Sequence, residues 1–330
     1  MKKLVRNVKI IGTGSYVPEK IYTNEYLETI LPTNAEWIYQ KLGIKERRVT
    51  TENEATSDLA AIAGQRAIDD AGLKNEDIEL IIVATLTPDR KTPCAAAFVQ
   101  HKLNAVNAAA FDLSAACSAF LFGMSVAAQY IAAGVYDRVL VVGADTLSKT
   151  TDWTRRDAVF FGDGAGAAVL TSVNEEEGGF LAYRIYTDTQ NEMLGFTIPG
   201  GGSEIPLNEN NLHEQYFQMN GKTVFDSAIQ VLPKAIFQVL EDAGLTIDDV
   251  DLMIPHQPSI RILQKTAEIV GLPFEKVMTN MDKYANTSGG TIPILLDEVK
   301  KSGKLKKDDI VLFAAVGSGW TYGAAIIKWA

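Results

Sequence analysis

Hydrophobic and polar positions follow the same order twice along this chain. The sequences AIDDAGLKNEDIELII at 67–82 and VLEDAGLTIDDVDLMI at 239–254 share an apolar pair, an acidic turn and then an apolar run. Asp70 corresponds to Asp242 and Leu140 to Leu312, each pair 172 positions apart. Apolar runs of this kind predict strands that are buried on both faces, and the alanine-rich stretches before them predict helices. We therefore expect two similar α/β halves, at 1–176 and 177–330.

The same pattern predicts the individual elements. Gly72 and Gly244 stand where the end of a helix needs a left-handed residue. The polar, glycine-rich segment 187–220 is expected to be a loop or lid, and the acidic NEEEGG sequence near 174–180 marks the boundary between the halves. Helices are predicted at 57–71, 118–133, 225–243, 260–270 and 292–302, and strands at 8–12 and 164–171.

Composition and charge narrow the class of protein. Hydrophobic residues make up 47% of the 330 positions and charged residues 22%, which excludes a disordered chain. The net charge of −10 argues against a nucleic-acid-binding protein, which needs a basic surface. The uncharged stretch 113–136 is long enough to span a membrane, but its serines, glycines and glutamine favour a helix between protein layers. Without a recognisable signal peptide, we expect a cytoplasmic protein that does not insert into membranes.

The two cysteines differ in their surroundings. Two thiols can form neither a disulfide scaffold nor a cysteine-based zinc site. Cys117, in DLSAACSAF, precedes a predicted helix whose N-terminus favours a thiolate, so it is a candidate nucleophile. A buried, unreactive cysteine is the alternative interpretation. For Cys94, in TPCAA, the unreactive interpretation is preferred.

Polar residues that could assist a nucleophile lie in the second half. His101 and His213 stand in polar stretches, whereas His256 follows a buried strand at its carboxyl end, where α/β sheets bind ligands. Asn286, in YANTSGGT, can donate from its side-chain amide just before a predicted helix. Taken singly, the histidine also fits a structural role and the asparagine a helix cap.

Glycine-rich segments offer backbone N–H groups but no nucleotide site. The sequence VGSGWTYG at 316–323 follows a buried strand, and glycine there can bring an N–H close to a ligand oxygen, although a simple tight turn fits equally well. The sequences GTG at 12–14 and GDGAG at 162–166 lack the following helix and acidic residue of a dinucleotide-binding motif. We therefore predict no nicotinamide cofactor.

Taken in order, these motifs identify a family. Cys117 in DLSAACSAF, His256 in PHQ, Asn286 in YANTSGG and the terminal VGSGWTYG, together with GDGAGAAVL at 162–170, resemble the ketoacyl-acyl carrier protein synthase III family. The resemblance covers essentially the whole chain. It implies an α/β protein of the thiolase fold, with five layers α-β-α-β-α from two duplicated halves, in a homodimer.

The resemblance also implies a reaction. Cys117 would take an acyl group from an acyl-CoA, and His256 and Asn286 would stabilise the enolate formed when a malonyl-type thioester loses CO2. The carbanion would then attack the acyl group to form a new C–C bond. The backbone N–H groups of Cys117 and Gly319 would form the oxyanion hole. The family needs CoA thioester substrates but no metal or other cofactor.

Substrate contacts and departures come from the same resemblance. Trp37 matches a tryptophan that stacks on the CoA adenine, with Arg155 as its cationic partner on the other face. Arg261 lies on the surface expected to meet an acyl carrier protein, where Asp226 replaces a lysine and should weaken docking. Thr92 stands where a phenylalanine from across the dimer limits acyl length in the well-known bacterial enzyme. These departures favour longer acyl chains and a specialised enzyme of secondary metabolism.

Two alternatives remain at this point. One is an acyltransferase variant that forms an ester, an amide or a C–C bond without decarboxylation. The other is a non-catalytic subunit that binds acyl chains or a carrier protein. A degradative thiolase is excluded because it needs a second active cysteine in the C-terminal glycine loop. The sequence leaves the acyl donor, the extender, the choice between CoA and carrier protein, and the pathway open.

Overall fold

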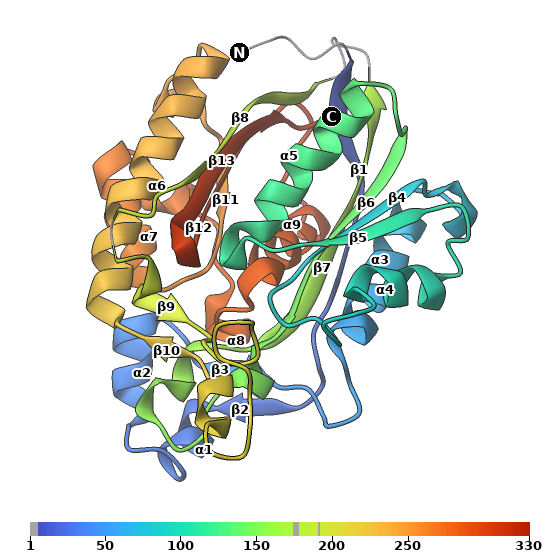
Figure 1. Ribbon diagram of the computed structural model, residues 1–330. Coiled ribbons are helices and arrows are strands. Elements are labelled where there is room, and N and C mark those ends of the chain that lie inside the picture. The colour runs from blue at the N-terminus through green and yellow to red at the C-terminus, as the bar shows by residue number, and fades with distance from the viewer. Residues whose placement is uncertain (1–5, 174–177, 191) are drawn as a thin grey trace.

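Two β-sheets with a pair of helices between them form the centre of the molecule (Figure 1). This computed structural model describes residues 6–173, 178–190 and 192–330. The central helices, α5 (Ala119–Ala132) and α9 (Thr291–Lys301), share one hydrophobic core with strands of both sheets. Helices also cover the outer face of each sheet. The predicted five-layer α-β-α-β-α arrangement is confirmed.

The first sheet has the strand order β1-β7-β6-β4-β5. β4 runs parallel to β5 and β6, whereas β7 is antiparallel to β1 and β6. α3 (Thr56–Asp70) and α4 (Ala95–Leu103) cover its outer face with small and branched apolar side chains. The strands are β1 (Asn7–Tyr16), β4 (Leu80–Ala84), β5 (Ala109–Leu113), β6 (Arg138–Thr146) and β7 (Asp163–Val173).

The second sheet repeats this order without one strand. Its order β8-β13-β12-β11 corresponds to β1-β7-β6-β4, with β11 parallel to β12 and the other pairs antiparallel. Where the repeat would place a partner of β5, the short helix α8 (Met281–Tyr284) stands instead. α6 (Gly221–Ala243) and α7 (Ile260–Val270) cover the outer face. The strands are β8 (Gly179–Thr187), β11 (Leu252–Pro255), β12 (Ile310–Gly317) and β13 (Thr321–Lys328).

A smaller cap lies at one end of the two sheets (Figure 1). Asn34 accepts a hydrogen bond from the Trp37 N–H and so starts α2, which places the tryptophan in its first turn. The elements of this end are α1 (Asn24–Glu28), α2 (Ala35–Leu42), β2 (Ile21–Thr23), β3 (Glu46–Arg48), β9 (Phe196–Thr197) and β10 (Gln218–Met219).

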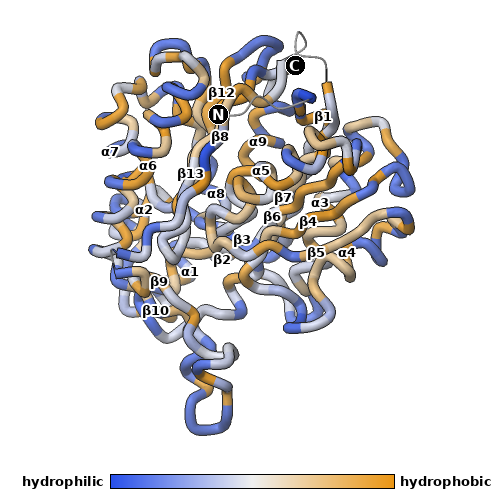
Figure 2. Tube along the Cα trace, turned by 45° about the horizontal axis from the view of Figure 1, so that its top comes forward, coloured by the Kyte–Doolittle hydropathy of each residue, from blue (hydrophilic) through white to orange (hydrophobic). Residues whose placement is uncertain are grey.

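The sequence pattern predicted these elements closely. The helix at 260–270 is as expected, and the ends of three others move by about a residue. α6 begins earlier than predicted, at Gly221, and β1 and β7 are longer. The segment 187–220 contains the short β9–β10 pair, and the expected boundary at 176/177 lies outside the described residues. Figure 2 shows the hydrophobic residues concentrated along the central strands and α5. In the described chain, the helices all fall short of the length and apolar character that a membrane span requires.

Candidate active site

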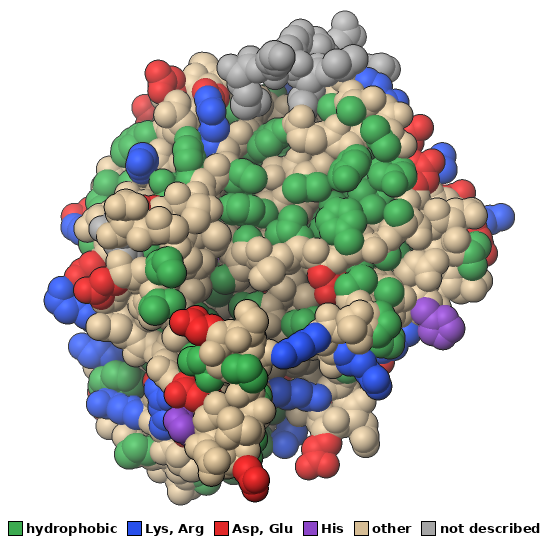
Figure 3. Space-filling view, viewed as in Figure 1, with side chains coloured by type: hydrophobic (Ala, Val, Ile, Leu, Met, Phe, Trp, Pro, Cys, Tyr) green, Lys and Arg blue, Asp and Glu red, His purple; other side chains and the backbone are tan. Residues whose placement is uncertain are grey.

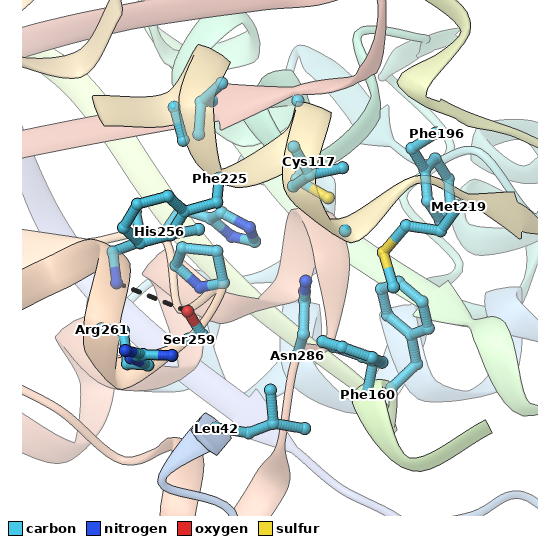
Figure 4. A pocket seen from close by; sticks show the side chains of 18 of the residues that line it. Leu42, Cys117, Phe160, Phe196, Met219, Phe225, His256, Ser259, Arg261 and Asn286 are labelled. Carbon is cyan, nitrogen blue, oxygen red and sulfur yellow. Dashed lines mark hydrogen bonds between the residues drawn. The ribbon is translucent and has the colours of Figure 1, made fainter. Parts of the chain in front are cut away.

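A cavity of about 300 Å³ brings together residues that are far apart in the sequence. Its floor carries three polar side chains, Cys117, His256 and Asn286, which Figure 4 shows around one space. The walls are mainly apolar, so the few polar groups can fix the orientation of a bound molecule. The apolar wall residues are Leu42, Phe160, Phe161, Phe196, Met219, Val224, Phe225, Ala228, Ile262, Val316 and Trp320.

Cys117 lies in a tight turn between β5 and α5. The turn Ala116–Ser118 is a single 3₁₀ turn, and Ala116 has a left-handed φ of 48°. Gly317 packs against it so closely that a Cβ there would lie 2.8 Å from the Cys117 nitrogen. Only a glycine fits at that contact, which explains part of the VGSG motif. The turn holds the half-buried cysteine at the floor of the cavity.

The Cys117 thiol is not a preformed thiolate. Although the residue is partly accessible from the cavity, the sulfur is surrounded by protein, and this burial raises the pKa of the Cys117 thiol to about 12. The side chains of Ser288 and Asn286 lie within hydrogen-bonding reach and lower that pKa in part. The expected thiolate at the helix N-terminus is therefore corrected, because desolvation outweighs the helix dipole.

His256 enters the cavity from the carboxyl end of β11. Its backbone N–H donates to Ala314 O at 2.8 Å, and its ring Nδ1 lies 2.7 Å from the Thr291 hydroxyl at the start of α9. Burial lowers the pKa of His256 to about 3, so the ring is neutral at physiological pH. With Nδ1 held by Thr291, Nε2 is the ring nitrogen left for a substrate.

Asn286 is held by its own backbone and by its side-chain oxygen. Its N–H donates to Phe160 O at 3.2 Å, and its carbonyl accepts from Gly162 N–H at 3.1 Å. The side-chain Oδ1 accepts from the Ser288 N–H at 2.8 Å. Because the oxygen is used inside the turn, the amide NH2 is the group available to the cavity (Figure 4).

The glycine loop after β12 contributes a different residue from the one expected. Gly317 and Ser318 line the cavity, whereas Gly319 is not among its lining residues. The Ser318 hydroxyl donates to Phe196 O at 2.5 Å, so its side chain is engaged away from Cys117. Ser318 is therefore a second candidate for the oxyanion hole, and the expected contribution of the Gly319 N–H stays a prediction.

In this structure Arg156, rather than Arg155, lies beside Trp37. The Arg156 guanidinium lies 3.9 Å from the centre of the Trp37 ring, at the mouth of the cavity. Arg155 instead contacts the Phe217 ring and carbonyl and forms an ion pair with Asp157. Consecutive residues in non-helical backbone point in different directions, and the expected contact of Arg155 with the far face of a bound adenine stays a prediction.

Three other expected residues differ in their surroundings. Arg261 is exposed and lines the cavity mouth together with Lys41. Asp226 accepts from the Lys222 ammonium at 2.5 Å. Lys222, one helical turn before Asp226, therefore supplies a positive charge near the position where Asp226 replaces a lysine. Thr92 is exposed before α4 and does not line this cavity.

Several wall residues carry no sequence signal of their own. Phe196 and Met219 come from β9 and β10, inside the segment expected to be a loop or lid. Thr291 could have been suspected only from its place in YANTSGGT. The described residues contain no group of three or more His, Cys, Asp or Glu side chains that could hold a metal ion.

Two family models match this chain. The model described as 3-oxoacyl-[acyl-carrier-protein (ACP)] synthase III matches residues 111–189, and that of the C-terminal part of the same family matches residues 240–329. These segments contain Cys117, His256 and Asn286.

Full-length relatives agree with the family models. The chain is 46% identical to the beta-ketoacyl-[acyl-carrier-protein] synthase III of Caldanaerobacter subterraneus over 97% of both chains. The crystal structure of 3-oxoacyl-[acyl-carrier-protein] synthase III from Aquifex aeolicus superposes with a TM-score of 0.89 at 41% identity, covering 98% of this chain and 100% of that one. The priming β-ketosynthase of the R1128 polyketide pathway superposes with a TM-score of 0.92 at 29% identity, covering 98% and 97%.

Proposed function

The chain belongs to the 3-oxoacyl-[acyl-carrier-protein] synthase III family and is a condensing enzyme, and from this premise we propose that Cys117, His256 and Asn286 carry out its reaction. The observation that carries the proposal is the meeting of a thiol, a neutral imidazole and a carboxamide NH2 in one largely apolar cavity. This set matches acyl transfer to sulfur followed by stabilisation of an enolate.

The first step is thioester exchange. The Cys117 sulfur attacks the acyl-CoA carbonyl, the C–S bond to CoA breaks, and the thiol proton ends on the departing CoA sulfur. Because the pKa of Cys117 is raised to about 12, the thiol proton leaves only as the sulfur attacks, and it passes to the departing CoA sulfur while His256 keeps its own proton at Nε2. The N–H groups of Cys117 and Ser318 stabilise the tetrahedral oxyanion, an assignment supported by the place of Ser318 in the cavity lining.

The second step is decarboxylative condensation. The thioester carbonyl of a malonyl group accepts hydrogen bonds from Asn286 and His256 while its terminal carboxylate leaves as CO2. Neutral donors suit this step, because they stabilise the developing enolate without trapping it as an enol. The resulting carbanion attacks acyl-Cys117, the C–C bond forms as the C–S bond to Cys117 breaks, and the released thiolate takes a proton from water. The comparisons do not favour the alternative of ester or amide formation.

Acyl-CoA and an acyl carrier protein are the proposed partners. Trp37 lines the cavity mouth, where its ring can stack on the CoA adenine once the Arg156 guanidinium, now 3.9 Å over that ring, moves to the other face of the base. Lys41 and Arg261 at the same mouth suit an acidic carrier protein, and the Lys222–Asp226 pair leaves that edge without excess negative charge. All proposed steps use side chains, backbone N–H groups and CoA thioesters, with no metal or redox cofactor.

A homodimer is proposed from an open strand edge. Among the described residues, β5 pairs with β4 alone, which leaves its other edge without a partner strand. Figure 3 shows hydrophobic side chains gathered on the face above α5. The partly buried Phe122, Val126 and Tyr136 and the more exposed Tyr130 suit a symmetric apolar contact there. Size-exclusion chromatography with light scattering tests this proposal.

The relatives support fatty acid biosynthesis as the pathway. Acyl-CoA and acyl carrier proteins are cytoplasmic substrates, so we propose that the enzyme acts in the cytoplasm. A role in secondary metabolism with longer acyl chains, expected from Thr92, stays a prediction. Loading of acetyl-CoA alone in a chain-length series would contradict it.

The deciding experiment follows the acyl group. Intact-mass spectrometry of the protein after incubation with a panel of acyl-CoAs should show one adduct on Cys117. Addition of malonyl-acyl carrier protein should discharge the adduct with release of CO2. Absence of any adduct would overturn the proposed function, and a discharge without CO2 would favour the acyltransferase alternative.

A further inference from the structure

A half-buried carboxylate outside the catalytic cavity contacts the segments that carry both donor residues. Glu298 lies on α9, about two turns after Thr291, whose hydroxyl contacts the His256 ring. Its Oε2 accepts from the Asn280 side-chain amide at 2.8 Å, and its Oε1 accepts from the Tyr284 hydroxyl at 2.7 Å. Glu298 is not among the residues that line the catalytic cavity; it lines a separate polar cavity of about 590 Å³. An effect of Glu298 on the reaction would therefore pass through the residues that it holds.

One oxygen of Glu298 holds the segment that ends in Asn286. Tyr284 closes the short helix α8, and two residues later the Asn286 side chain lines the catalytic cavity. Between them, Ala285 has a φ of 56° and a ψ of −151°, a conformation that costs a non-glycine residue energy and persists only when its surroundings hold it. The hydrogen bond from Tyr284 to Glu298 is on one side of Ala285. The bond from the Asn286 N–H to Phe160 O is on the other side.

The other oxygen of Glu298 holds the residues on either side of His256. Asn280 donates its side-chain amide to Glu298, and its backbone N–H donates to the Gln257 Oε1 at 3.2 Å. The Gln257 Nε2 donates in turn to Pro255 O at 3.0 Å. Asn280 and Gln257 are almost completely buried, with exposed fractions of 3% and 1%. The residues before and after His256 are therefore bonded to each other, and Asn280 connects them to the carboxylate.

We propose that Glu298 is a positioning residue for the decarboxylation step, because one carboxylate holds the backbone segments that carry both donors to the malonyl carbonyl. Through one oxygen it acts on Asn286, and through the other it acts on His256. Acyl transfer to Cys117, which comes from the other half of the chain, does not depend on it. The inference rests on the proposed roles of these three side chains.

Glu298→Ala removes both hydrogen bonds, and two single-turnover rates should then separate. CO2 release from malonyl-acyl carrier protein, measured on the acylated enzyme, should slow about tenfold because the two donors lose their alignment on the enolate. Acylation of Cys117 by acyl-CoA, followed by intact-mass spectrometry, should change less than about twofold. A mere loss of folded protein would lower both rates alike. Equal losses, or unchanged CO2 release in the folded variant, would overturn the proposal.

Glu298→Gln is the conservative variant. Its amide oxygen can accept from Asn280 and its NH2 can donate to the Tyr284 hydroxyl, so both contacts can form without the charge. The ion pair of Glu298 with Lys283, at 3.4 Å and largely exposed, is lost but contributes little. CO2 release should therefore stay within about threefold of the wild-type rate. A loss as large as that of Glu298→Ala would overturn a role through these hydrogen bonds.

Lys300→Met is the matched control on the same helix. Lys300 forms an ion pair with Asp70, which ties α9 to the end of α3 in the first half. Its partner lies outside the segment 280–286, so the variant should release CO2 at the wild-type rate. A loss equal to that of Glu298→Ala would assign the effect to the support of α9 as a whole and overturn the specific role of Glu298.

Two smaller changes keep the proposal testable if Glu298→Ala does not fold. Tyr284→Phe removes one hydroxyl, and Asn280→Ala removes one side-chain amide while the backbone N–H to Gln257 remains. Each should slow CO2 release about threefold and leave the acylation rate unchanged. Wild-type CO2 release in both variants would overturn the proposal.

The wild-type protein separates this inference from the proposed function. A wild-type protein that forms no acyl adduct and releases no CO2 would overturn the proposed function and the inference with it. A wild-type protein that completes both steps, together with a Glu298→Ala variant in which the two rates do not separate, would overturn only the inference about Glu298.

Discussion

The turn before α5 and the turn before α9 have the same backbone but opposite roles. Ala116–Ser118 and Ser288–Gly290 are both 3₁₀ turns, 172 residues apart, and each begins with a left-handed non-glycine residue, at φ 48° and 51°. The first presents Cys117 to the cavity. The second has Gly289 at that position, and its N–H donates to the buried Asp145.

This difference shows that the two copies of the repeated unit contribute different residues to one site. Three residues before Cys117, the first half has the exposed Ser114; three residues before Gly289, the second half has the buried Asn286. At the end of the matching strands, Ala84 corresponds to His256. In the proposed reaction, one half thus supplies the nucleophile and the other supplies the donors. The two turns meet because each packs on the other half's central strand, where no side chain larger than glycine fits at Gly143 or Gly317.

The largest expected effect comes from removing the nucleophile of the first turn. Cys117→Ala should abolish acyl adducts and lower overall turnover by about 10³-fold or more, because no other thiol lies in the cavity. Intact-mass spectrometry measures the adduct. Adding Gly289→Cys to this variant should not restore loading, since a Cβ there points at Ala84 O, 3.1 Å away. Loading in the double variant would mean that the two turns are interchangeable.

The next effect separates the donors from the nucleophile. Asn286→Ala should reduce CO2 release by about 10²-fold or more while acyl loading of Cys117 continues, because the amide acts on the enolate. Ser114→Ala, at the corresponding position of the first half, is the matched control and should release CO2 at nearly the wild-type rate. Equal losses in the two variants would contradict the division of labour.

The third prediction concerns pH. Since the pKa of Cys117 is about 12, the thiolate fraction and the alkylation rate should rise about tenfold per pH unit between pH 7 and 10. Since the pKa of His256 is about 3, its neutral form is lost only as the pH falls toward 3, so CO2 release should show no step from this group between pH 5 and 8. A sharp loss of CO2 release near pH 6.5 would show that His256 titrates normally.

The smallest effect concerns the entrance rather than the two turns. Arg156→Ala removes the guanidinium that stacks on Trp37 and should raise the KM for acyl-CoA about fivefold, corresponding to about 1 kcal/mol of cation–π contact. Arg155→Ala should change KM less, because Arg155 contacts Phe217 and Asp157 instead. Steady-state kinetics with acyl-CoA as the varied substrate measures both, and the reverse order would restore the assignment to Arg155.

Much of the fold followed from local pattern. The repeat at 67–82 and 239–254 predicted matching helices, turns and buried strands, and the structure confirms them, with left-handed Gly72 and Gly244 at the helix ends. Continuous apolar runs predict buried parallel strands, and apolar residues at helical spacing predict the helices that cover them. Both patterns can be seen in a single sequence. Among the described residues, α8 rather than a strand matches β5 in the second half, and this was not predicted because strand pairing depends on neighbours rather than on local sequence.

The sequence predicted only part of the candidate site. Cys117, His256 and Asn286 were identified by their residue types and by the motifs around them, and the structure brings them to one cavity. For Arg155 and Gly319, the structure places a neighbour, Arg156 beside Trp37 and Ser318 in the cavity lining, because these placements depend on which way a non-repetitive backbone turns; the roles expected of Arg155 and Gly319 stay predictions. The thiolate expected at Cys117 was wrong, because the sequence shows a helix start but not the desolvation around the sulfur.

By itself, the sequence determined the two-fold repeat, the order of the layers and the three polar residues of the site. Only the tertiary structure decided how those residues are charged and what faces them: a thiol held protonated, a histidine held neutral and a carboxylate at the Gly289 N–H. The physical reason is that apolar periodicity is a property of neighbouring residues. Desolvation and hydrogen bonding, in contrast, depend on groups that folding brings together from distant positions, such as Thr291 at His256, 35 positions away, and Asp145 at Gly289, 144 positions away.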